Sequence, residues 1–322
     1  MLTSISLKDK IKAEASRLGF FVCGFARAEP VSEAMRRHYL GWLADGRNAD
    51  MAYLGNNLDK RFDPRLLMPS VKTIVVVAQN YFPARRLPEG EPQIADYALG
   101  LDYHDIVKQK LRQLAATVGI ADYRAFVDTA PVLERYWAVR AGLGWIGKNQ
   151  QLIIPHAGSE FFLGELFVTV ELPPDEPLPN RCGTCHRCVD ACPTHALSLP
   201  ATCVEGYGDI TRFDARLCLS YQTIENRGEL TVDAKGAMGD TFYGCDRCQR
   251  ACPWNRFAKP STEPLLQPRE ELLAMTRQKW GNLTEEDYRR LFKGSAVKRA
   301  KYEGLMRNIK ACLAGEATPP TP

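Results

Sequence analysis

The 322-residue sequence has no apolar run long enough to cross a membrane. A membrane-spanning helix needs about 20 apolar residues, whereas the longest apolar stretches here, 73–78 and 161–172, are short or interrupted. The N-terminus also lacks the apolar stretch of a signal peptide, because three lysines and an aspartate stand between positions 8 and 12. We therefore expect a cytoplasmic protein that makes no contact with a membrane.

The chain has too few cysteines for a disulfide scaffold and little excess charge. Its eleven cysteines fall well below the ~8–10% of small disulfide-rich proteins. A net charge of +4 permits a polyanionic partner without requiring one. Nine of the cysteines lie between 182 and 252, and grouped cysteines in a reducing compartment favour metal binding over disulfides.

Strand-like and helix-like segments alternate over the first 172 residues. β-branched and aromatic residues predict strands at 20–26, 72–81, 123–128, 151–155 and 161–172. Helical spacing of apolar residues, or a proline suited to a first turn, predicts helices over 5–18, 103–118 and 129–141. The fold class is therefore predicted as α+β, with an N-terminal α/β layer domain whose sheet order stays open.

Composition divides the chain into three predicted domains. PPDEPLPN at 173–180 has the composition of a linker. We expect an α/β domain at 1–172, a cysteine-rich domain at 173–260 and a C-terminal helical segment at 261–322. The last residues, GEATPPTP, are expected to be disordered.

The cysteine-rich region contains one short internal repeat. Residues 185–193 and 245–253 both read C-x-R-C-x-x-A-C-P. Cys182 completes the first copy to C-x2-C-x2-C-x3-C-P, the run of bacterial ferredoxins, in which the fourth cysteine binds the other cluster of a pair. The repeat therefore predicts a ferredoxin-like domain with two 4Fe–4S clusters.

The second copy lacks one local ligand, because Phe242 stands where the run would have a cysteine. Cys203 and Cys218 are the candidates to replace it, and we favour Cys218, which lies between the charged stretch RFDAR and the ordered-looking LSYQTIE. Four ligands per cluster then give two groups. The first is Cys182, Cys185, Cys188 and Cys252, and the second is Cys192, Cys218, Cys245 and Cys248.

Structural zinc is the main alternative for these cysteines, since two C-x2-C pairs can form a tetrahedral site. Zinc does not explain the x3 spacing, the trailing prolines or the copied motif. Two clusters would instead carry single electrons at low potential, which makes this region an electron path without naming the reaction.

Several longer motifs resemble the epoxyqueuosine reductase family. They are VDTAPVLERYWAVRAGLGWIGKN (127–149), AGSEFFLGEL (157–166), CLSYQTIENRG (218–228) and YGCDRCQRACPWN (243–255). The resemblance extends over residues 10–310, whereas a simple dicluster ferredoxin would share only the cysteine runs.

The resemblance implies a cytoplasmic enzyme that binds one cobalamin and two 4Fe–4S clusters. Such an enzyme reduces the epoxide of epoxyqueuosine to an alkene at the wobble position of tRNA, the last step of queuosine synthesis. The first domain would resemble the corrinoid domain of reductive dehalogenases, and Cys218, in the C-x-S-Y-x-T-I-E motif, would be the remote cluster ligand. The implied partners are tRNA with a queuosine-type anticodon and a low-potential donor of flavodoxin or ferredoxin type, and we expect a monomer.

Asp128 matches the aspartate that the family uses as its proposed proton donor. Opening an epoxide without a proton is costly, so a positioned acid helps. Burial beside Phe126 and Val127 would keep the carboxyl partly protonated. The alternative is a helix N-cap, since Thr129-Ala-Pro follows, and the two roles are compatible.

Seven polar residues are further candidates for corrinoid contacts. Taken singly, each is also typical of a surface or a turn. They are Tyr103, His104, Lys148, Asn149, Ser159, Ser220 and Tyr221. His156 is not assigned as a cobalt ligand, because the family lacks a histidine ligand from the protein.

A basic stretch near the end fits an RNA partner. Eight cations there would contact phosphates, which give affinity without reading sequence, although a solvated helix face explains them equally well. They are Arg289, Arg290, Lys293, Lys298, Arg299, Lys301, Arg307 and Lys310. Many family members continue into a longer helical-repeat region, so we expect a smaller grip on RNA here.

Two other functions compete with this interpretation. A dehalogenase-like corrinoid enzyme would act on a small organic molecule, but it would not need the basic stretch. A ferredoxin-type electron carrier would leave the first 170 residues and Asp128 without a role.

Overall fold

A computed structural model describes residues 6–204 and 207–315, so the tail expected to be disordered lies almost wholly outside the described residues. A four-stranded antiparallel sheet forms the centre of the first region, in the order β1-β2-β7-β4. Its strands are β1 (Val22–Arg27), β2 (Thr73–Asn80), β7 (Phe161–Val168) and β4 (Tyr123–Phe126). The expected strands are thus confirmed, and β4 forms an edge of the sheet.

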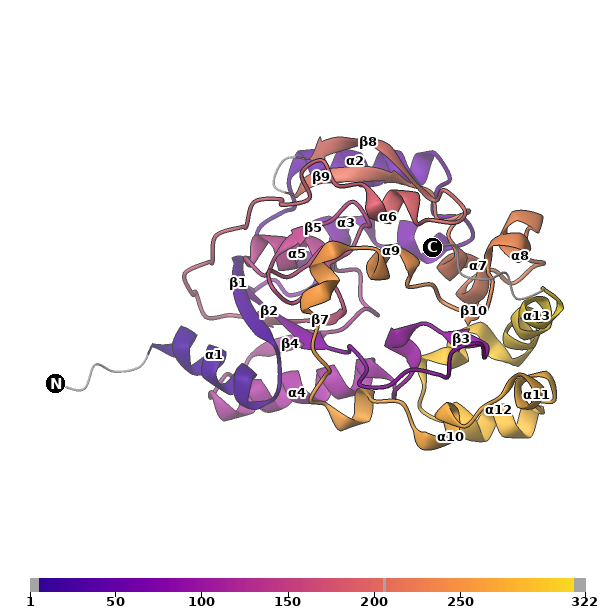
Figure 1. The fold of residues 1–322 in the computed structure, drawn as a ribbon. Coiled ribbons are helices and arrows are strands. Elements are labelled where there is room, and N and C mark those ends of the chain that lie inside the picture. The colour runs from indigo at the N-terminus through magenta and orange to yellow at the C-terminus, as the bar shows by residue number, and fades with distance from the viewer. Residues whose placement is uncertain (1–5, 205–206, 316–322) are drawn as a thin grey trace.

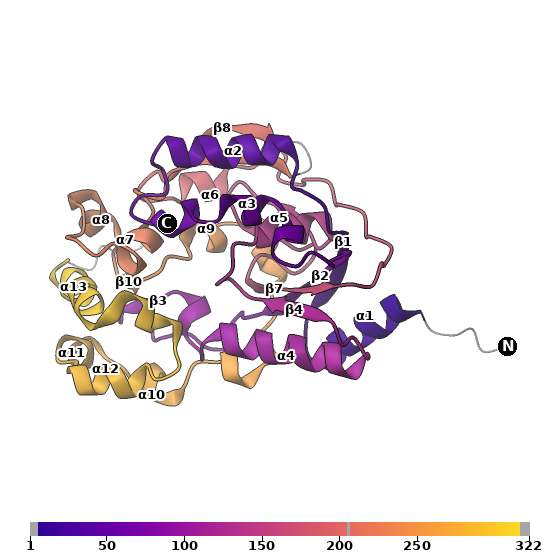
Figure 2. The same ribbon diagram turned by 180° about the vertical axis from the view of Figure 1, so that it is seen from behind.

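Helices cover both faces of this sheet (Figures 1 and 2). The helices α1 (Leu7–Arg17) and α4 (Tyr103–Thr117) pack on one face, where Val75 and Val77 of β2 point. The helix α5 (Glu134–Arg140) packs on the other face with Ile74 and Val76, joined by α2 (Glu33–Ala44) and α3 (Leu58–Phe62). Because side chains alternate along a strand, the apolar run Ile74–Ala78 of β2 is buried on both sides of the sheet.

The cysteine region folds above the sheet in Figure 1. Each repeat copy forms one short helix, α6 (Arg187–Asp190) or α9 (Arg247–Arg250), and these two helices pack together. Between them come the hairpin of β8 (Leu197–Val204) and β9 (Gly208–Phe213), then α7 (Leu219–Ile224) and α8 (Val232–Ala237). Two short strands, β5 (Trp145–Ile146) and β6 (Leu152–Ile153), pair antiparallel nearby.

The remaining helices pack around a second apolar core. They are α10 (Glu270–Leu273), α11 (Arg277–Gly281), α12 (Glu285–Leu291) and α13 (Lys301–Ala314). This core combines residues from 87–99, 219–243 and 272–312. It includes the parallel pair of β3 (Gln93–Ile94) and β10 (Thr241–Tyr243), so segments from all three predicted domains meet in it.

One expected helix boundary was wrong. The helix predicted to begin at Thr129 begins at Glu134, because residues 127–133 form tight turns first, with Thr129 N–H donating to Val127 and Val132 N–H donating to Ala130. In the described part of the chain, no helix combines the length and apolarity that crossing a membrane requires.

Candidate functional site

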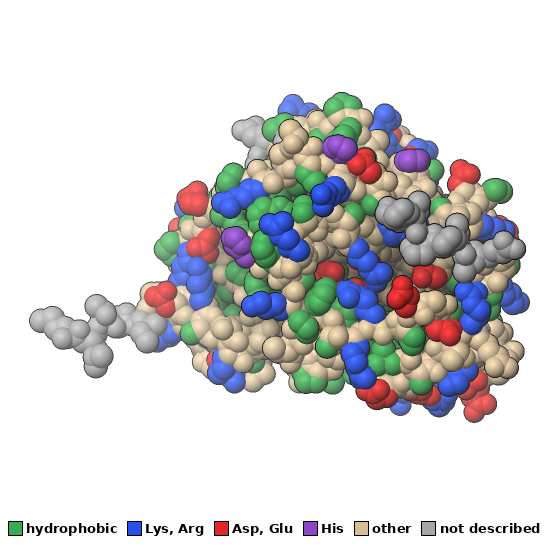
Figure 3. Space-filling model, viewed as in Figure 1, with side chains coloured by type: hydrophobic (Ala, Val, Ile, Leu, Met, Phe, Trp, Pro, Cys, Tyr) green, Lys and Arg blue, Asp and Glu red, His purple; other side chains and the backbone are tan. Residues whose placement is uncertain are grey.

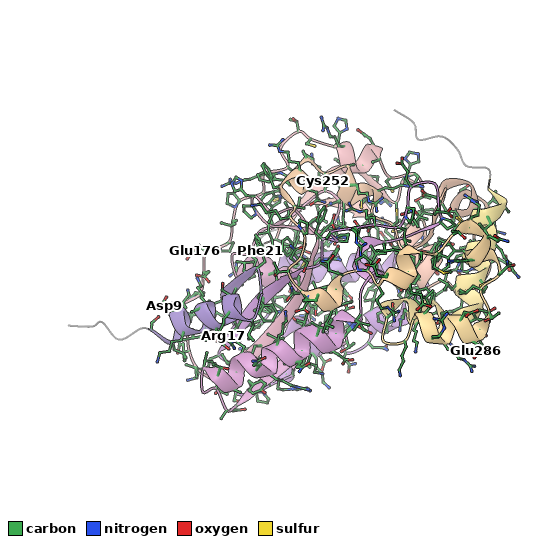
Figure 4. The ribbon with its side chains drawn as sticks, turned by 60° about the horizontal axis from the view of Figure 1, so that its bottom comes forward. Asp9, Arg17, Phe21, Glu176, Cys252 and Glu286 are labelled. Atoms are coloured by element: carbon green, nitrogen blue, oxygen red, sulfur yellow. The ribbon has the colours of Figure 1, made fainter. Side chains whose placement is uncertain are left out.

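The first cysteine group surrounds a cavity of about 90 Å³. The cavity is lined by Cys182, Cys185, Cys188 and Cys252, together with Lys148 and Asn149; Cys252 is labelled in Figure 4. Burial raises the pKa of Cys188 to about 12, and the neighbouring cysteines add to the shift. Among the described residues, no three His, Cys, Asp or Glu side chains meet closely enough for a single metal ion. The four sulfurs instead enclose a space, as the ligands of a multi-iron cluster do.

The second cysteine group also comes together in space. Cys192, Cys218 and Cys248 belong to one buried apolar cluster. Burial raises the pKa of Cys248 well above its usual value, and next Cys245, Cys218 and Cys192 raise it further. A metal would take these thiols as thiolates and release their protons on binding.

The two candidates for the remote ligand lie in different surroundings. Cys218 joins the second group at the start of α7, where burial raises its pKa and the N–H groups of Ser220 and Tyr221 oppose that shift. Cys203 is exposed on β8. Phe242 is fully buried against Trp280, with ring centroids 4.8 Å apart. The structure therefore gathers the eight predicted cysteines into two groups of four and leaves Cys203 outside them.

Asp128 occupies a strained turn at the carboxyl end of β4. Its φ of 54° lies in the left-handed region, which few residues other than glycine adopt and which Asp and Asn tolerate best. Thr129 N–H donates to the Val127 carbonyl at 2.5 Å, so Asp128 is the central residue of a three-residue turn. Asp128 is not an N-cap, because α5 begins only at Glu134 and Leu133 precedes it.

Tyr103 and His104, at the start of α4, point at Asp128. The Tyr103 hydroxyl donates to Oδ2 of Asp128 at 2.6 Å, and Nε2 of His104 lies 3.4 Å from the same oxygen. Nδ1 of His104 lies 2.6 Å from Oδ1 of Asp102. Within the described part of the chain, no donor reaches Oδ1 of Asp128, whose side chain is 57% exposed. The Asp128 side chain is therefore accessible to a ligand.

These contacts favour a protonated His104 beside an ionised Asp128. Burial acts to raise the pKa of Asp128, but hydrogen bonds from His104 and Tyr103 outweigh it and lower the pKa. Burial acts to lower the pKa of His104, but the hydrogen bonds and charges of Asp102 and Asp128 raise it to about 9. The expectation that burial keeps Asp128 protonated was therefore wrong, because two donors stabilise its charged form.

Sequence reasoning missed two carboxyls behind this turn. Glu134 accepts a hydrogen bond from the N–H of Asp128, and burial followed by the charge of Asp128 raises its pKa to about 8. Glu165, in β7, is fully buried. The run FFLGELFV gives no sign that its one acid faces a second acid, since only the packing of α5 on the sheet brings the two together.

Lys148, Asn149 and Ser159 contact the cysteine loops. Nζ of Lys148 donates to the carbonyls of Gly183 and Cys185 at 2.8 and 2.9 Å. Nδ2 of Asn149 donates to the carbonyl of Cys248 at 3.4 Å. Ser159 hydrogen-bonds Asn255, which follows the second cysteine run. Within the described residues, these hydrogen bonds tie the three side chains to the cysteine loops and not to Tyr103, His104 or Asp128.

Ser220 and Tyr221 lie beside Cys218, as their sequence position requires. The hydroxyl of Tyr221 donates to Oδ2 of Asp50 at 2.6 Å, which links α7 to the loop before Tyr53. Tyr53 is 46% exposed and is close enough to Asp128 for that charge to raise the tyrosine's pKa, after burial and Glu225. His156 packs against the ring of Phe257, 5.5 Å away.

Half of the cations in the basic stretch are engaged within the protein. Arg289, Arg290 and Arg299 form ion pairs with acids, and Arg307 donates to backbone carbonyls. In Figure 3 basic and acidic side chains accordingly lie side by side over the C-terminal helices, at the lower right. Lys293, Lys298, Lys301 and Lys310 are exposed.

A polar cavity of about 500 Å³ lies beside the Asp128 turn. It is lined by Thr129 and Ala130 of the turn, by β4 and by Lys108 and Arg112 of α4. With Arg124 it carries three cations, which suits a phosphate-bearing ligand.

Two family models match the parts of the chain that contain Asp128 and the cysteine groups. Residues 61–129 match the family model described as "Epoxyqueuosine reductase QueG, DUF1730". Residues 181–255 match the model described as "4Fe-4S double cluster binding domain", which favours iron–sulfur clusters over zinc.

Relatives along the whole chain carry the same description. The chain is 43% identical over 313 residues to an epoxyqueuosine reductase of Cellulophaga algicola, covering 96% of this chain and 99% of the relative. It is 38% identical to that of Pseudomonas aeruginosa, covering 95% of this chain and 85% of the relative.

Solved structures of epoxyqueuosine reductases share the fold. One, holding an epoxyqueuosine-modified tRNA-Tyr stem loop, superposes with a TM-score of 0.82 at 26% identity and covers 96% of this chain and 81% of its own. Another, from Bacillus subtilis, superposes with a TM-score of 0.81 at 25% identity over the same shares, and is described with its aspartate-bearing catalytic loop swung out of the active site. The chain belongs to the epoxyqueuosine reductase family of oxidoreductases.

Proposed function

We propose that this chain reduces the epoxide of epoxyqueuosine to an alkene at the wobble position of tRNA. The observation that carries the proposal is the Tyr103–His104–Asp128 group in a chain of this family. The relative solved with a modified tRNA stem loop supports the substrate. The exposed Lys293, Lys298, Lys301 and Lys310 would contribute phosphate contacts.

The reaction consumes two electrons and two protons and releases the epoxide oxygen as water. The Tyr103–His104–Asp128 group supplies one of these protons to that oxygen, and solvent supplies the other. Asp128 faces the substrate, and His104, whose pKa is raised to about 9, gives its proton to Oδ2 of Asp128, which then delivers that proton to the epoxide oxygen. Tyr103 keeps the carboxylate oriented through its 2.6 Å hydrogen bond. Asp128 is thus the donor to the substrate, with His104 as its store of protons.

The cysteine groups fit two 4Fe–4S clusters. Cys182, Cys185, Cys188 and Cys252 would hold one, and Cys192, Cys218, Cys245 and Cys248 the other. Lys148, Asn149 and Ser159 would hold the loops that carry these ligands. When bound, the clusters and a cobalamin would supply electrons at low potential.

The residues around Asp128 also fit a large cofactor such as cobalamin. The exposed Asp128 and Tyr53 would offer it a polar and an aromatic contact, whereas the cavity of about 500 Å³ beside the turn is lined by other residues. Tyr103, His104, Ser220 and Tyr221 remain the proposed contacts. We assign residues 1–172 to cofactor binding and catalysis, 173–260 to the two clusters, and 261–322 to structural support and RNA contact. We further propose that the protein is a monomer and that a flavodoxin- or ferredoxin-type protein donates its electrons.

Mass analysis of tRNA nucleosides tests this function. Anaerobically reconstituted protein with a low-potential reductant should convert epoxyqueuosine to queuosine. Asp128→Ala should keep its iron and cobalamin but lose product formation, whereas Asp122→Ala, an exposed acid before β4, should behave as the wild type. Full turnover by Asp128→Ala would remove that residue as the donor, and a protein without corrinoid absorbance bands after reconstitution would remove cobalamin.

A further inference from the structure

Glu165 is an unusual residue for the centre of a sheet. It lies in β7 between Val76 of β2 and Phe126 of β4, and its side chain is fully buried. No N–H or hydroxyl donor among the described residues reaches either carboxyl oxygen. A buried polar group without a partner is costly, so its retention in an apolar strand calls for a reason.

The group that faces Glu165 is a second carboxyl. Glu165 points to the same side of β7 as Leu163 and Phe167, which pack with α5, and Glu134 is the first residue of α5. The two carboxyls lie close enough for each to act on the pKa of the other. Because two neighbouring carboxylates only repel, their close approach is favourable only when the pair holds a proton that one can donate to the other.

The surroundings keep the proton on the pair at neutral pH. Burial first, and then Glu134, raises the pKa of Glu165 well above its usual value. The other titratable groups that act on the pair are Asp128, Tyr103 and Arg135. Arg135 favours the ionised form of Glu134, but it is exposed, so solvent weakens the effect of its charge.

The pair is connected to the reacting site through the backbone. Glu134 accepts the N–H of Asp128, whose φ of 54° costs about 1–2 kcal/mol in a non-glycine residue. A conformation of that cost persists only when its surroundings hold it. The contact with Glu134 does so, and it fixes the direction of the Asp128 carboxylate toward Tyr103 and His104.

We propose that Glu134 and Glu165 form a proton-sharing carboxyl pair that positions Asp128. Glu165 donates the shared proton to Glu134 and so fixes that side chain, and Glu134 holds the N–H of Asp128. Glu134 is a positioning residue, since it acts on the substrate only through Asp128. The proposal rests on the proposed function, in which Asp128 delivers the proton.

Substitutions of Glu134 separate positioning from packing. Glu134→Ala removes the acceptor, and kcat on an epoxyqueuosine-modified stem-loop RNA should fall about 10- to 100-fold, the range of one hydrogen bond to a charged or buried group. KM, iron and cobalamin contents should stay within about twofold of the wild type, since the contact is made behind Asp128. Glu134→Gln keeps an oxygen for the Asp128 N–H and should restore kcat to within about threefold.

Glu165 is tested by a matched series. Glu165→Gln still donates to Glu134 and should retain most of kcat, whereas Glu165→Leu should reduce kcat as Glu134→Ala does. Glu171→Gln, an exposed acid beyond β7, is the control and should leave kcat unchanged. If Glu165→Leu does not fold, the glutamine variants and the spectrum described next decide the question.

Infrared difference spectra report the proton directly. Wild type minus Glu165→Gln at neutral pH should show the C=O band of a protonated carboxyl, and wild type minus Glu171→Gln should not. Wild-type kcat in Glu134→Ala, equal damage by Glu134→Gln and Glu134→Ala, or no carboxyl band would each overturn the pair. A wild type without turnover on the RNA would refute the proposed function instead, and the spectrum would still report the pair.

Discussion

Replacing Asp102 by asparagine should change where His104 loses its proton without disturbing the helix that carries it. Asp102 is the N-cap of α4, where its side chain accepts the His104 N–H at 3.1 Å. Asparagine caps a helix as well as aspartate does, so α4 should form normally. What disappears is the negative charge 2.6 Å from Nδ1 of His104.

The size of the effect follows from the charges around the imidazole. Asp102 and Asp128 together raise the pKa of His104 from 6.5 to about 9 against the opposing effect of burial. Loss of one nearby opposite charge shifts a pKa by about 1–3 units, and for Asp102→Asn we take a fall of about 1.5 units. His104 keeps its proton at pH values below its pKa, so activity should fall as the pH rises through that pKa. Because the variant has the lower pKa, it should lose activity at a lower pH than the wild type.

The ratio of kcat in the variant to kcat in the wild type isolates this shift. Protonated fractions give a ratio of about 0.9 at pH 6.5, about 0.5 at pH 7.5 and about 0.1 at pH 8.5. Groups that titrate alike in both proteins, including Glu134, cancel in the ratio. The assay is single-turnover reduction of an epoxyqueuosine-modified stem-loop RNA, followed by nucleoside mass analysis.

A matched control lies on the same helix. Asp105 is exposed, and Asp105→Asn should give a ratio near one at every pH. A ratio for Asp102→Asn that does not change between pH 6.5 and 8.5 would refute the assignment of the proton to His104.

Three further predictions concern the clusters, the core and the RNA. Cys218→Ser should lose iron relative to the about eight irons of two 4Fe–4S clusters, while Cys203→Ser should keep all of it; the reverse result would exchange the ligands. Phe242→Cys should bind no additional iron and should destabilise the fold by about 2–4 kcal/mol, since it empties a buried ring site; urea unfolding of the reconstituted protein measures this, and an unchanged midpoint would contradict it. Lys298→Gln and Lys301→Gln should each reduce the salt dependence of stem-loop affinity by about one phosphate contact, and unchanged slopes would remove these lysines from the RNA surface.

The grouping of the cysteines could be predicted from sequence because short spacings constrain it. Three residues separated by two positions each must approach one another whatever the rest of the chain does. The same fixed spacing showed from sequence that the second run lacks a cysteine at position 242, where Phe242 stands. The remote ligand depended on where α7 packs, and the sequence offered only its neighbourhood, so Cys203 stayed open until the fold placed it on an exposed strand.

The chemistry at Asp128 could be predicted only in part from the sequence. Its identity came from a motif, but its ionisation depends on Tyr103 and His104, which approach from a helix 25 residues earlier in the chain. Glu165 was hidden for a related reason. Its register beside Val76 and Phe126, and the packing of α5 over it, are tertiary facts that no local pattern records.

The pairing of β3 with β10 has a consequence for the modularity of the molecule. Residues 87–99 and 219–243 share one apolar core with the C-terminal helices. The cysteine region therefore contributes only part of the apolar core that stabilises it. A fragment cut at 173 and 260 would leave Phe242 and Tyr243, both fully buried here, facing water. The cysteine region is therefore not a module that can be moved alone to another protein, since residues 87–99 and the C-terminal helices complete its core.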